Sequence, residues 1–323
     1  MNSVYIKTGP VEITLKTRNN TRLTHLIHGK LKPFILKVPG KDPAVLDIEL
    51  VRPEIEEDIN KADADFLKNH FTRIFSRPPV IKNIHSRIKA AHCEYKFCAG
   101  NPLFRSCMKK AVNSPDKWTI LDLNSGMLFF NARSKKGVLF MRSNTPLPAL
   151  KTTLINVTAF ISSICGHLND ALLMHGAGIV LSKRGFVFLG RSNAGKTTIT
   201  KLAGRSNALN DDGIIAGIDR KGCYIMRTPL DQNSKNNTRS ASDKYYTNDL
   251  FLLIKSGRTR ASTCLKKEAL TEILNYHIHY LRYFDNHSGK KAFKLAYQIV
   301  KRLNCYYLHF NRSREFLDLI TSK

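Results

Sequence analysis

The sequence is short of acidic residues. Only 25 Asp and Glu stand against 52 Lys and Arg in 323 residues, which gives a formal net charge of +27. The excess is even, with 25 basic and 13 acidic residues in 1–150 and 27 and 12 in 151–323. A nucleic-acid-binding arm would concentrate positive charge in one segment. The even spread therefore favours a generally basic surface, while attraction to an acidic partner or to nucleic acid stays open.

Long hydrophobic runs are also missing. No stretch approaches the 18 consecutive apolar residues of a transmembrane helix, and residues 1–15 lack the apolar centre of a signal peptide. The seven cysteines are scattered and odd in number, which favours reduced thiols over a disulfide framework. These absences predict a cytoplasmic protein without a membrane span. They are compatible with either a monomer or an oligomer.

One segment carries a specific chemical signature. Residues 190–197 read G-x-x-x-x-G-K-[ST], the phosphate-binding P-loop, between an apolar run at 185–189 and a potential helix at 198–203. In that context backbone N–H groups turn toward phosphate oxygens at the positive end of a helix. Lys196 is expected at the β- and γ-phosphates and Thr197 at Mg²⁺. The residues predicted to line the nucleotide site are Gly190, Arg191, Ser192, Asn193, Ala194, Gly195, Lys196, Thr197 and Thr198.

The first half of the chain has the signature of strands. Residues 44–51 alternate apolar and acidic side chains with a period of two, as a half-buried strand does. Turn residues separate the last three of the expected strands. The expected strands are 3–6, 11–15, 34–37, 44–51, 118–123, 127–130 and 138–141. We therefore predict an antiparallel, β-rich (α+β) domain over residues 1–146.

The second half mixes helices and strands. Apolar residues from Leu150 to Leu168 recur every three or four positions and predict a helix of about twenty residues. A hairpin at 177–189 feeds directly into the P-loop. The remaining expected elements are a strand at 250–254, helices at 266–280 and 290–303, and a strand at 306–308. We predict an α/β P-loop domain over residues 147–323.

Two polar elements flank the P-loop in sequence. His175 precedes the hairpin, and Asp211-Asp212 follows the expected P-loop helix. An acidic pair at this position can ligate Mg²⁺ or accept a proton from an attacking hydroxyl. A plain turn is the alternative for the aspartates, and a hydrogen-bonded core histidine is the alternative for His175.

Together these segments resemble the HPr kinase/phosphorylase family and its relatives, whose nucleotide fold is akin to that of phosphoenolpyruvate carboxykinase. The resemblance rests on Leu172–Gly178, the hairpin, the P-loop and Leu209–Asp212. It implies an HPr-kinase-like P-loop domain that binds ATP and Mg²⁺. It also implies that one aspartate acts as general base and the other as metal ligand. We assign Thr197 and Asp212 to the metal, with His175, Asp211 and Asp212 as catalytic candidates.

The chain departs from the family pattern at two places. Asn193 stands where the family usually has glycine, and no Leu-Glu-x-Arg-Gly-x-Gly segment follows the acidic pair. We therefore predict an ATP·Mg²⁺-dependent kinase that phosphorylates a hydroxyl, foremost serine, of a peptide, protein or small molecule other than HPr. The alternatives are a nucleotide-gated binding module without phosphoryl transfer and a basic nucleic-acid-binding ATPase.

Other candidate sites have weaker patterns. Zinc ligation by Cys and His lacks a C-x-x-C knuckle and competes with structural thiols. Three arginines could face the transferred phosphoryl group, although a solvated arginine is the commoner interpretation of each. An aromatic cluster is more typical of core or interface than of base stacking. These sets are His85, His92, Cys93, Cys98 and Cys107; Arg227, Arg239 and Arg258; and Tyr276, Tyr280, Tyr283 and Phe284.

Overall fold

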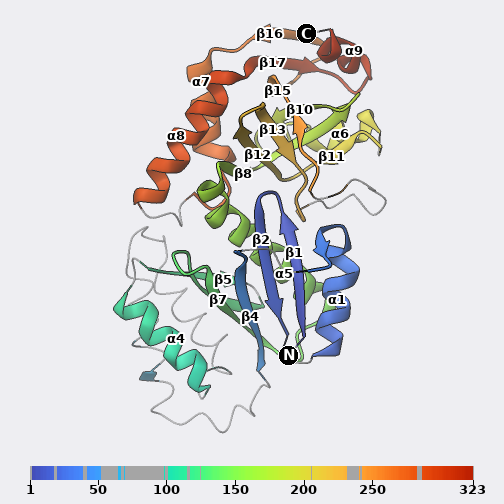
Figure 1. The fold of residues 1–323 in the computed structure, drawn as a ribbon. Helices are drawn as coiled ribbons and strands as arrows, with labels where there is room; N and C mark the ends of the chain where they lie inside the picture. The colour runs from blue at the N-terminus through green and yellow to red at the C-terminus, as the bar shows by residue number, and fades with distance from the viewer. Residues whose placement is uncertain are drawn as a thin grey trace. The chain divides into compact units, whose positions relative to one another are not determined.

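The structure is a computed structural model with a mixed α/β fold (Figure 1). It describes residues 2–17, 20–38, 42–51, 65–66, 69, 98, 101–114, 117–123, 125–204, 206–230, 240, 242–281 and 286–322. The chain divides into two compact units. Unit 1 comprises residues 1–5, 13–30 and 39–157, and unit 2 comprises residues 6–12, 31–38 and 158–323. The last boundary between the two units falls after Val157, and the sequence predicts a domain boundary after residue 146.

A seven-stranded sheet, in the order β3-β1-β2-β4-β7-β6-β5, carries the first half of the chain. The prediction of an antiparallel domain is wrong at its centre, because β4 pairs in parallel with both β2 and β7. Parallel neighbours need a crossover, and helix α1 (Thr21–Leu31) lies between β2 and β4 in the chain. A period of two does not distinguish the two kinds of pairing. The strands are β1 (Ser3–Thr8), β2 (Val11–Lys16), β3 (Ile35–Leu36), β4 (Ala44–Val51), β5 (Trp118–Leu123), β6 (Gly126–Asn131) and β7 (Lys136–Arg142).

Helix α4 (Pro102–Asn113) builds part of the core of unit 1. Its Phe104 lies edge-on to Phe129 and Phe140, with ring centroids 5.6 and 5.1 Å apart. Cys98 and Cys107 are buried in the same cluster, where burial raises the pKa of both thiols, that of Cys107 to about 11. Both thiols are therefore protonated at neutral pH and act as apolar packing.

The proposed zinc ligands His85, His92 and Cys93 lie outside the described residues. Within the described ranges, no group of three or more His, Cys, Asp or Glu side chains is placed to hold a metal ion.

Unit 2 contains two further sheets. A six-stranded sheet has the order β11-β9-β10-β15-β17-β16, and a four-stranded sheet has the order β14-β13-β12-β8. Strands β10, β15 and β17 are parallel neighbours, so their carboxyl ends meet at one edge. The strands are β8 (Ala171–Met174), β9 (Gly176–Leu181), β10 (Arg184–Leu189), β11 (Ala208–Asn210), β12 (Ile214–Asp219), β13 (Gly222–Met226), β14 (Tyr245–Tyr246), β15 (Asp249–Lys255), β16 (Arg260–Thr263) and β17 (Asn304–Phe310).

Alternate side chains of β10 enter two different hydrophobic clusters. Val187 and Leu189 join the cluster that contains residues of α7 and α8, while Phe186 and Phe188 join the cluster that contains residues of α6 and α9. The apolar run of β10 is therefore that of a strand buried on both faces. The helices are α5 (Leu147–Gly166), α6 (Lys196–Ala203), α7 (Lys266–Glu272), α8 (Asn286–Arg302) and α9 (Glu315–Thr321).

The helix predicted over 266–280 is shorter than expected. After α7 the chain makes one π-helical turn at Ile273–His277, and Ile278 then bridges to Met174 as an isolated strand residue. Local propensity favours a continuous helix, but Ile278 pairs with Met174, which is distant in the chain, and the helix stops before it. Single π-helical turns are frequent at functional sites.

Helix α5 is the one described helix that is long and apolar enough to cross a membrane. In the structure, 61% of its most apolar window is buried. The core helix of a soluble protein passes the same test of length and composition.

Candidate functional site

The P-loop joins the carboxyl end of β10 to helix α6. Gly195 adopts φ +111°, and a Cβ there would lie 2.4 Å from the Phe310 ring, so no other residue fits without rearrangement. Arg191, Ser192 and Asn193 are exposed along the outside of the loop. The order strand, loop and helix predicted from the sequence is present.

The ammonium group of Lys196 lies inside this loop. It donates to the carbonyl oxygens of Gly190 at 2.6 Å and Arg191 at 3.2 Å, and the residue is 7% exposed. Burial lowers the pKa of Lys196, an effect opposed by the charges of Asp212 and Asp211. The loop therefore holds its cation beneath the backbone that would surround a phosphate chain.

Asn193 has a left-handed backbone with φ +63°, which explains why asparagine can stand where the family usually has glycine. We expect Asn193→Gly to keep the wild-type stability, because glycine adopts this conformation freely. Asn193→Val should lower the free energy of unfolding by about 1–2 kcal/mol. Urea unfolding of the two variants measures the difference. Equal stability would show that the loop relaxes out of this conformation.

The two adjacent aspartates face different partners. The Thr197 hydroxyl donates to Asp211 Oδ2 at 3.4 Å, at the start of α6. Asp212 Oδ1 lies 3.2 Å from His175 Nδ1, whose second neighbour is the Asp212 carbonyl oxygen at 3.0 Å. The hydrogen bond from His175 is the main reason that the pKa of Asp212 is lowered. The structure thus brings His175, Thr197 and both aspartates together beside the P-loop.

A buried amide network holds the aspartate-bearing loop in place. Asn210 Nδ2 donates to Thr228 Oγ1 at 2.6 Å and to the Gly213 carbonyl oxygen. Thr228 Oγ1 donates in turn to that same carbonyl oxygen at 2.6 Å. These bonds join Asn210 to Gly213, on either side of Asp211 and Asp212, and so they restrict the backbone that carries the two aspartates. This role is not predictable from the sequence, because Asn210 and Thr228 are 18 positions apart in the chain.

Two further histidines, also missed in the sequence analysis, adjoin His175. His277 is fully buried, donates from Nδ1 to the His175 carbonyl oxygen at 2.7 Å, and accepts the His175 N–H at its own carbonyl at 2.7 Å. The His279 ring lies edge-on to His175 with centroids 5.3 Å apart. The π-helical turn delivers His277 to this position. Because the sequence predicts a continuous helix over 266–280, it does not predict that His277 and His279 lie beside His175.

His277 should make stability depend on pH. Burial lowers the pKa of His277 to about 4, and the positive charges of His175 and Lys196 act in the same direction. Below the ordinary histidine pKa of about 6.5, this side chain binds a proton in the unfolded chain but stays neutral in the folded chain. The free energy of unfolding therefore falls as the pH decreases from about 6.5 to about 4.

Replacement of this histidine should remove part of that dependence. His277→Asn keeps a donor near the Nδ1 position and should lose less stability between pH 7 and pH 5 than the wild type. His287→Gln, at an exposed position of α8, should retain the wild-type loss. Urea unfolding at both pH values measures each change. An identical loss in all three proteins would contradict the assignment.

The remaining candidates lie in different environments. Arg227 is 1% exposed and its guanidinium lies 5.4 Å from the Phe34 ring centroid, so its interpretation as a solvated arginine is wrong. Arg258 is exposed in a turn, as expected. Tyr276 is exposed beside Arg191, while Tyr280 lies edge-on to Phe160. Arg239, Tyr283 and Phe284 lie outside the described residues.

The site combines the P-loop, which encloses the Lys196 ammonium group, with two carboxylates that have different partners. Oxygen donors from Thr197 and Asp211 match the preference of Mg²⁺, which needs one or two carboxylates besides substrate phosphates and water. Asp212 with His175 offers an acceptor for a proton. Neither a protein-family model nor a curated protein matches this sequence.

Proposed function

We propose that unit 2 is an HPr-kinase-like P-loop domain that binds ATP with Mg²⁺ and transfers the γ-phosphoryl group to a hydroxyl, foremost that of serine. The acceptor would be a peptide, a protein or a small molecule. The observation that carries the proposal is the division of the aspartates, one at the Thr197 hydroxyl and one at His175. If Asp211 and Asp212 only formed a turn, we would not expect each carboxylate to have a separate polar partner. The proposal places this chemistry in the cytoplasm.

We propose Asp211 as the metal ligand, whereas the sequence predicts Asp212 for this role. Asp211 lies at the hydroxyl of Thr197, the P-loop residue expected at the metal. When bound, Mg²⁺ would neutralise charge on the β- and γ-phosphates. Lys196 would add its own positive charge from inside the loop. The P-loop backbone would orient the phosphate chain without a covalent intermediate.

Asp212 would then handle the proton of the acceptor. The hydroxyl oxygen forms a bond to the γ-phosphorus, the bond to the β,γ-bridging oxygen breaks, and ADP leaves with that electron pair. The hydroxyl proton passes to Asp212. The lowered pKa of Asp212 keeps it ionised at neutral pH, which suits a group that orients the hydroxyl and takes its proton late. His175 would position this carboxylate and stabilise its charge.

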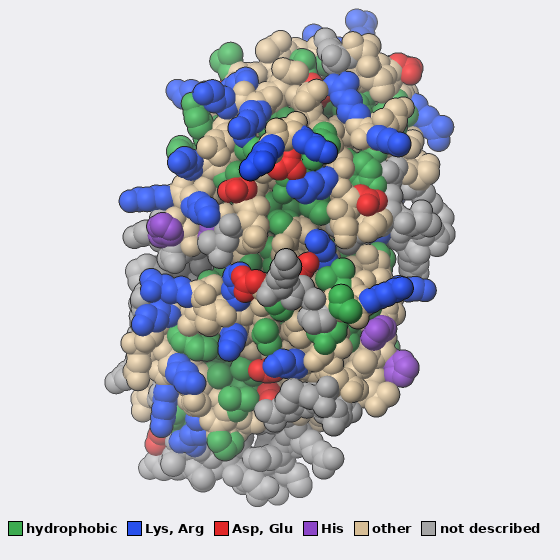
Figure 2. Space-filling view, in the orientation of Figure 1, with side chains coloured by type: hydrophobic (Ala, Val, Ile, Leu, Met, Phe, Trp, Pro, Cys, Tyr) green, Lys and Arg blue, Asp and Glu red, His purple; other side chains and the backbone are tan. Residues whose placement is uncertain are grey.

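The described residues on the face shown in Figure 2 give no specific support for the nucleic-acid alternative. Figure 2 shows Lys and Arg side chains scattered over the displayed face, with Asp and Glu among them. A nucleic-acid-binding surface typically gathers its positive charge along one face or helix.

The direct test uses γ-labelled ATP, Mg²⁺ and the proteins and peptides encoded beside this gene. Label on an acceptor hydroxyl, located by mass spectrometry, is the expected result. Nucleotide binding without any transfer or slow hydrolysis would instead indicate a nucleotide-gated binding module. Hydrolysis stimulated by RNA or DNA, with steep salt dependence, would indicate a nucleic-acid-binding ATPase.

A further inference from the structure

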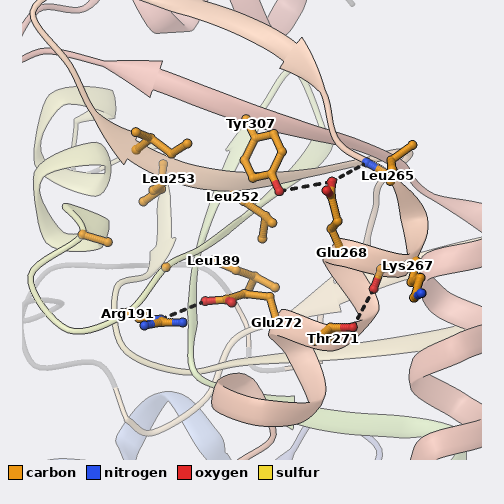
Figure 3. Close-up of a pocket in the computed structure, with 13 residues that line it drawn as sticks. Leu189, Arg191, Leu252, Leu253, Leu265, Lys267, Glu268, Thr271, Glu272 and Tyr307 are labelled. Atoms are coloured by element: carbon orange, nitrogen blue, oxygen red, sulfur yellow. Dashed lines mark hydrogen bonds and ion pairs between the residues drawn. The ribbon is translucent and has the colours of Figure 1, made fainter.

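One carboxylate oxygen lies between the P-loop and the buried histidines. Glu272 Oε1, at the end of α7, is 3.5 Å from Arg191 Nε in the P-loop and 3.9 Å from His277 Nε2. The side chains of Arg191 and Glu272 are directed toward one another (Figure 3). Since His277 bonds to His175, and His175 to Asp212, a chain of polar contacts runs from the P-loop to the proposed proton acceptor.

The tautomer of His277 explains why its contact with Glu272 is not a hydrogen bond. His277 Nδ1 lies 2.7 Å from the His175 carbonyl oxygen, which only accepts, so Nδ1 carries the hydrogen. In the neutral ring, Nε2 then has a lone pair and faces a carboxylate that has no hydrogen to donate. Within the described residues, this buried Nε2 has no hydrogen-bond partner. One proton here would create a bond between Nε2 and Glu272 Oε1.

In this structure Arg191 supplies the positive charge that Glu272 faces. Its side chain is 66% exposed, and its guanidinium lies 4.2 Å from the ring centroid of Tyr276. Exposed ion pairs are weak because water screens them. A phosphate chain in the loop is a stronger partner for Arg191, since a guanidinium and a phosphate form charge-assisted hydrogen bonds.

We propose that Glu272 is a positioning residue that couples occupation of the P-loop to the histidines behind Asp212. An anion in the loop attracts Arg191, and Glu272 Oε1 then bonds to His277 Nε2 as that ring takes up a proton from solvent. Glu272 and Arg191 both line a cavity of about 720 Å³, through which the proton arrives. This inference rests on the proposed function, in which the anion is the phosphate chain of ATP. It adds that the support of Asp212 responds to the nucleotide.

The groups around His277 set the direction of the effect. Burial and the positive charges of His175, His279 and Lys196 lower the pKa of this ring to about 4. Glu272 is the carboxylate beside it, and a carboxylate bonded to Nε2 raises the pKa. The charge of bound phosphates raises it as well, but in every variant alike. A comparison between variants therefore isolates the contribution of Glu272.

The test is calorimetric titration of the full chain with ATP and Mg²⁺ at pH 6, without an acceptor, in two buffers that differ in enthalpy of ionisation. The difference between the buffers gives the number of protons bound together with ATP. The wild type should take up on the order of half a proton more than Glu272→Gln. His277→Asn should lose the same uptake. Glu315→Gln, exposed on α9, removes an equal charge elsewhere and should behave like the wild type.

Glu272→Gln should also change ATP affinity in the direction opposite to that of structural damage. Because the amide competes less for Arg191, ATP should bind about two- to fivefold more tightly at pH 7.5. In a protein that also carries Arg191→Gln, the same substitution should have a smaller effect on affinity. Weaker ATP binding by Glu272→Gln would show that Glu272 only maintains the structure, and would overturn the coupling.

The proton count separates the two proposals. Equal uptake in the wild type and Glu272→Gln, with ATP bound by both, would overturn the coupling and leave the kinase proposal intact. An affinity gain of the same size with and without Arg191 would do likewise. Failure of the wild type to bind ATP would overturn the proposed function and this inference with it.

Discussion

Asp212→Asn should lower the rate of phosphoryl transfer by on the order of 10²-fold or more while ATP affinity changes little. The amide keeps the size of the side chain but removes the charge that His175 faces at 3.2 Å. Without that carboxylate, nothing at this position can take the acceptor proton. Single-turnover transfer with a known acceptor measures the rate, and slow ATP hydrolysis serves until an acceptor is known.

Asp211→Asn should behave differently, because its partner is the Thr197 hydroxyl. Its rate should also fall, but raised Mg²⁺ should restore part of it, whereas Asp212→Asn should not respond. Asp318→Asn, at an exposed position of α9, removes the same charge elsewhere and should leave the rate unchanged. Wild-type rates in both site variants would show that the aspartates form only a turn, and rescue of Asp212→Asn alone would restore the assignment made from sequence.

Lys196→Ala should have the largest effect on use of the nucleotide. The Lys196 ammonium is held by two loop carbonyls and is expected to move to the β- and γ-phosphates when ATP binds. Loss of one such preorganised charge typically lowers turnover by about 10²–10³-fold. ATP affinity should fall as well, since the charge also stabilises the bound ground state. Calorimetry and single-turnover transfer separate the two effects.

Lys201→Ala provides the matched control, because Lys201 is exposed on the same helix. It should retain both affinity and rate. Circular dichroism of each variant shows whether the fold is kept. A folded Lys196→Ala protein with unchanged affinity and turnover would remove the nucleotide site from consideration.

Much of the site could be located from sequence because its determinants are local. The P-loop spacing, the apolar run of β10 and the start of α6 are contiguous, and the structure has all three in the expected order. The sequence predicts Asp211-Asp212 and His175 as site residues because they flank this segment, and their side chains lie beside it. Asn193 stands where the family usually has glycine, and its positive φ is a conformation that asparagine tolerates.

What the sequence determined by itself was the P-loop motif, its strand–loop–helix context and the residue types around it, since short-range spacing and side-chain chemistry are read directly from the chain. The tertiary structure decided which aspartate faces Thr197, which faces His175, and that His277 supports His175 from 102 residues away. It also decided the parallel pairing at the centre of the N-terminal sheet and the early end of α7. These features depend on pairing between distant segments, and local periodicity and propensity carry no information about which distant partner a residue will meet.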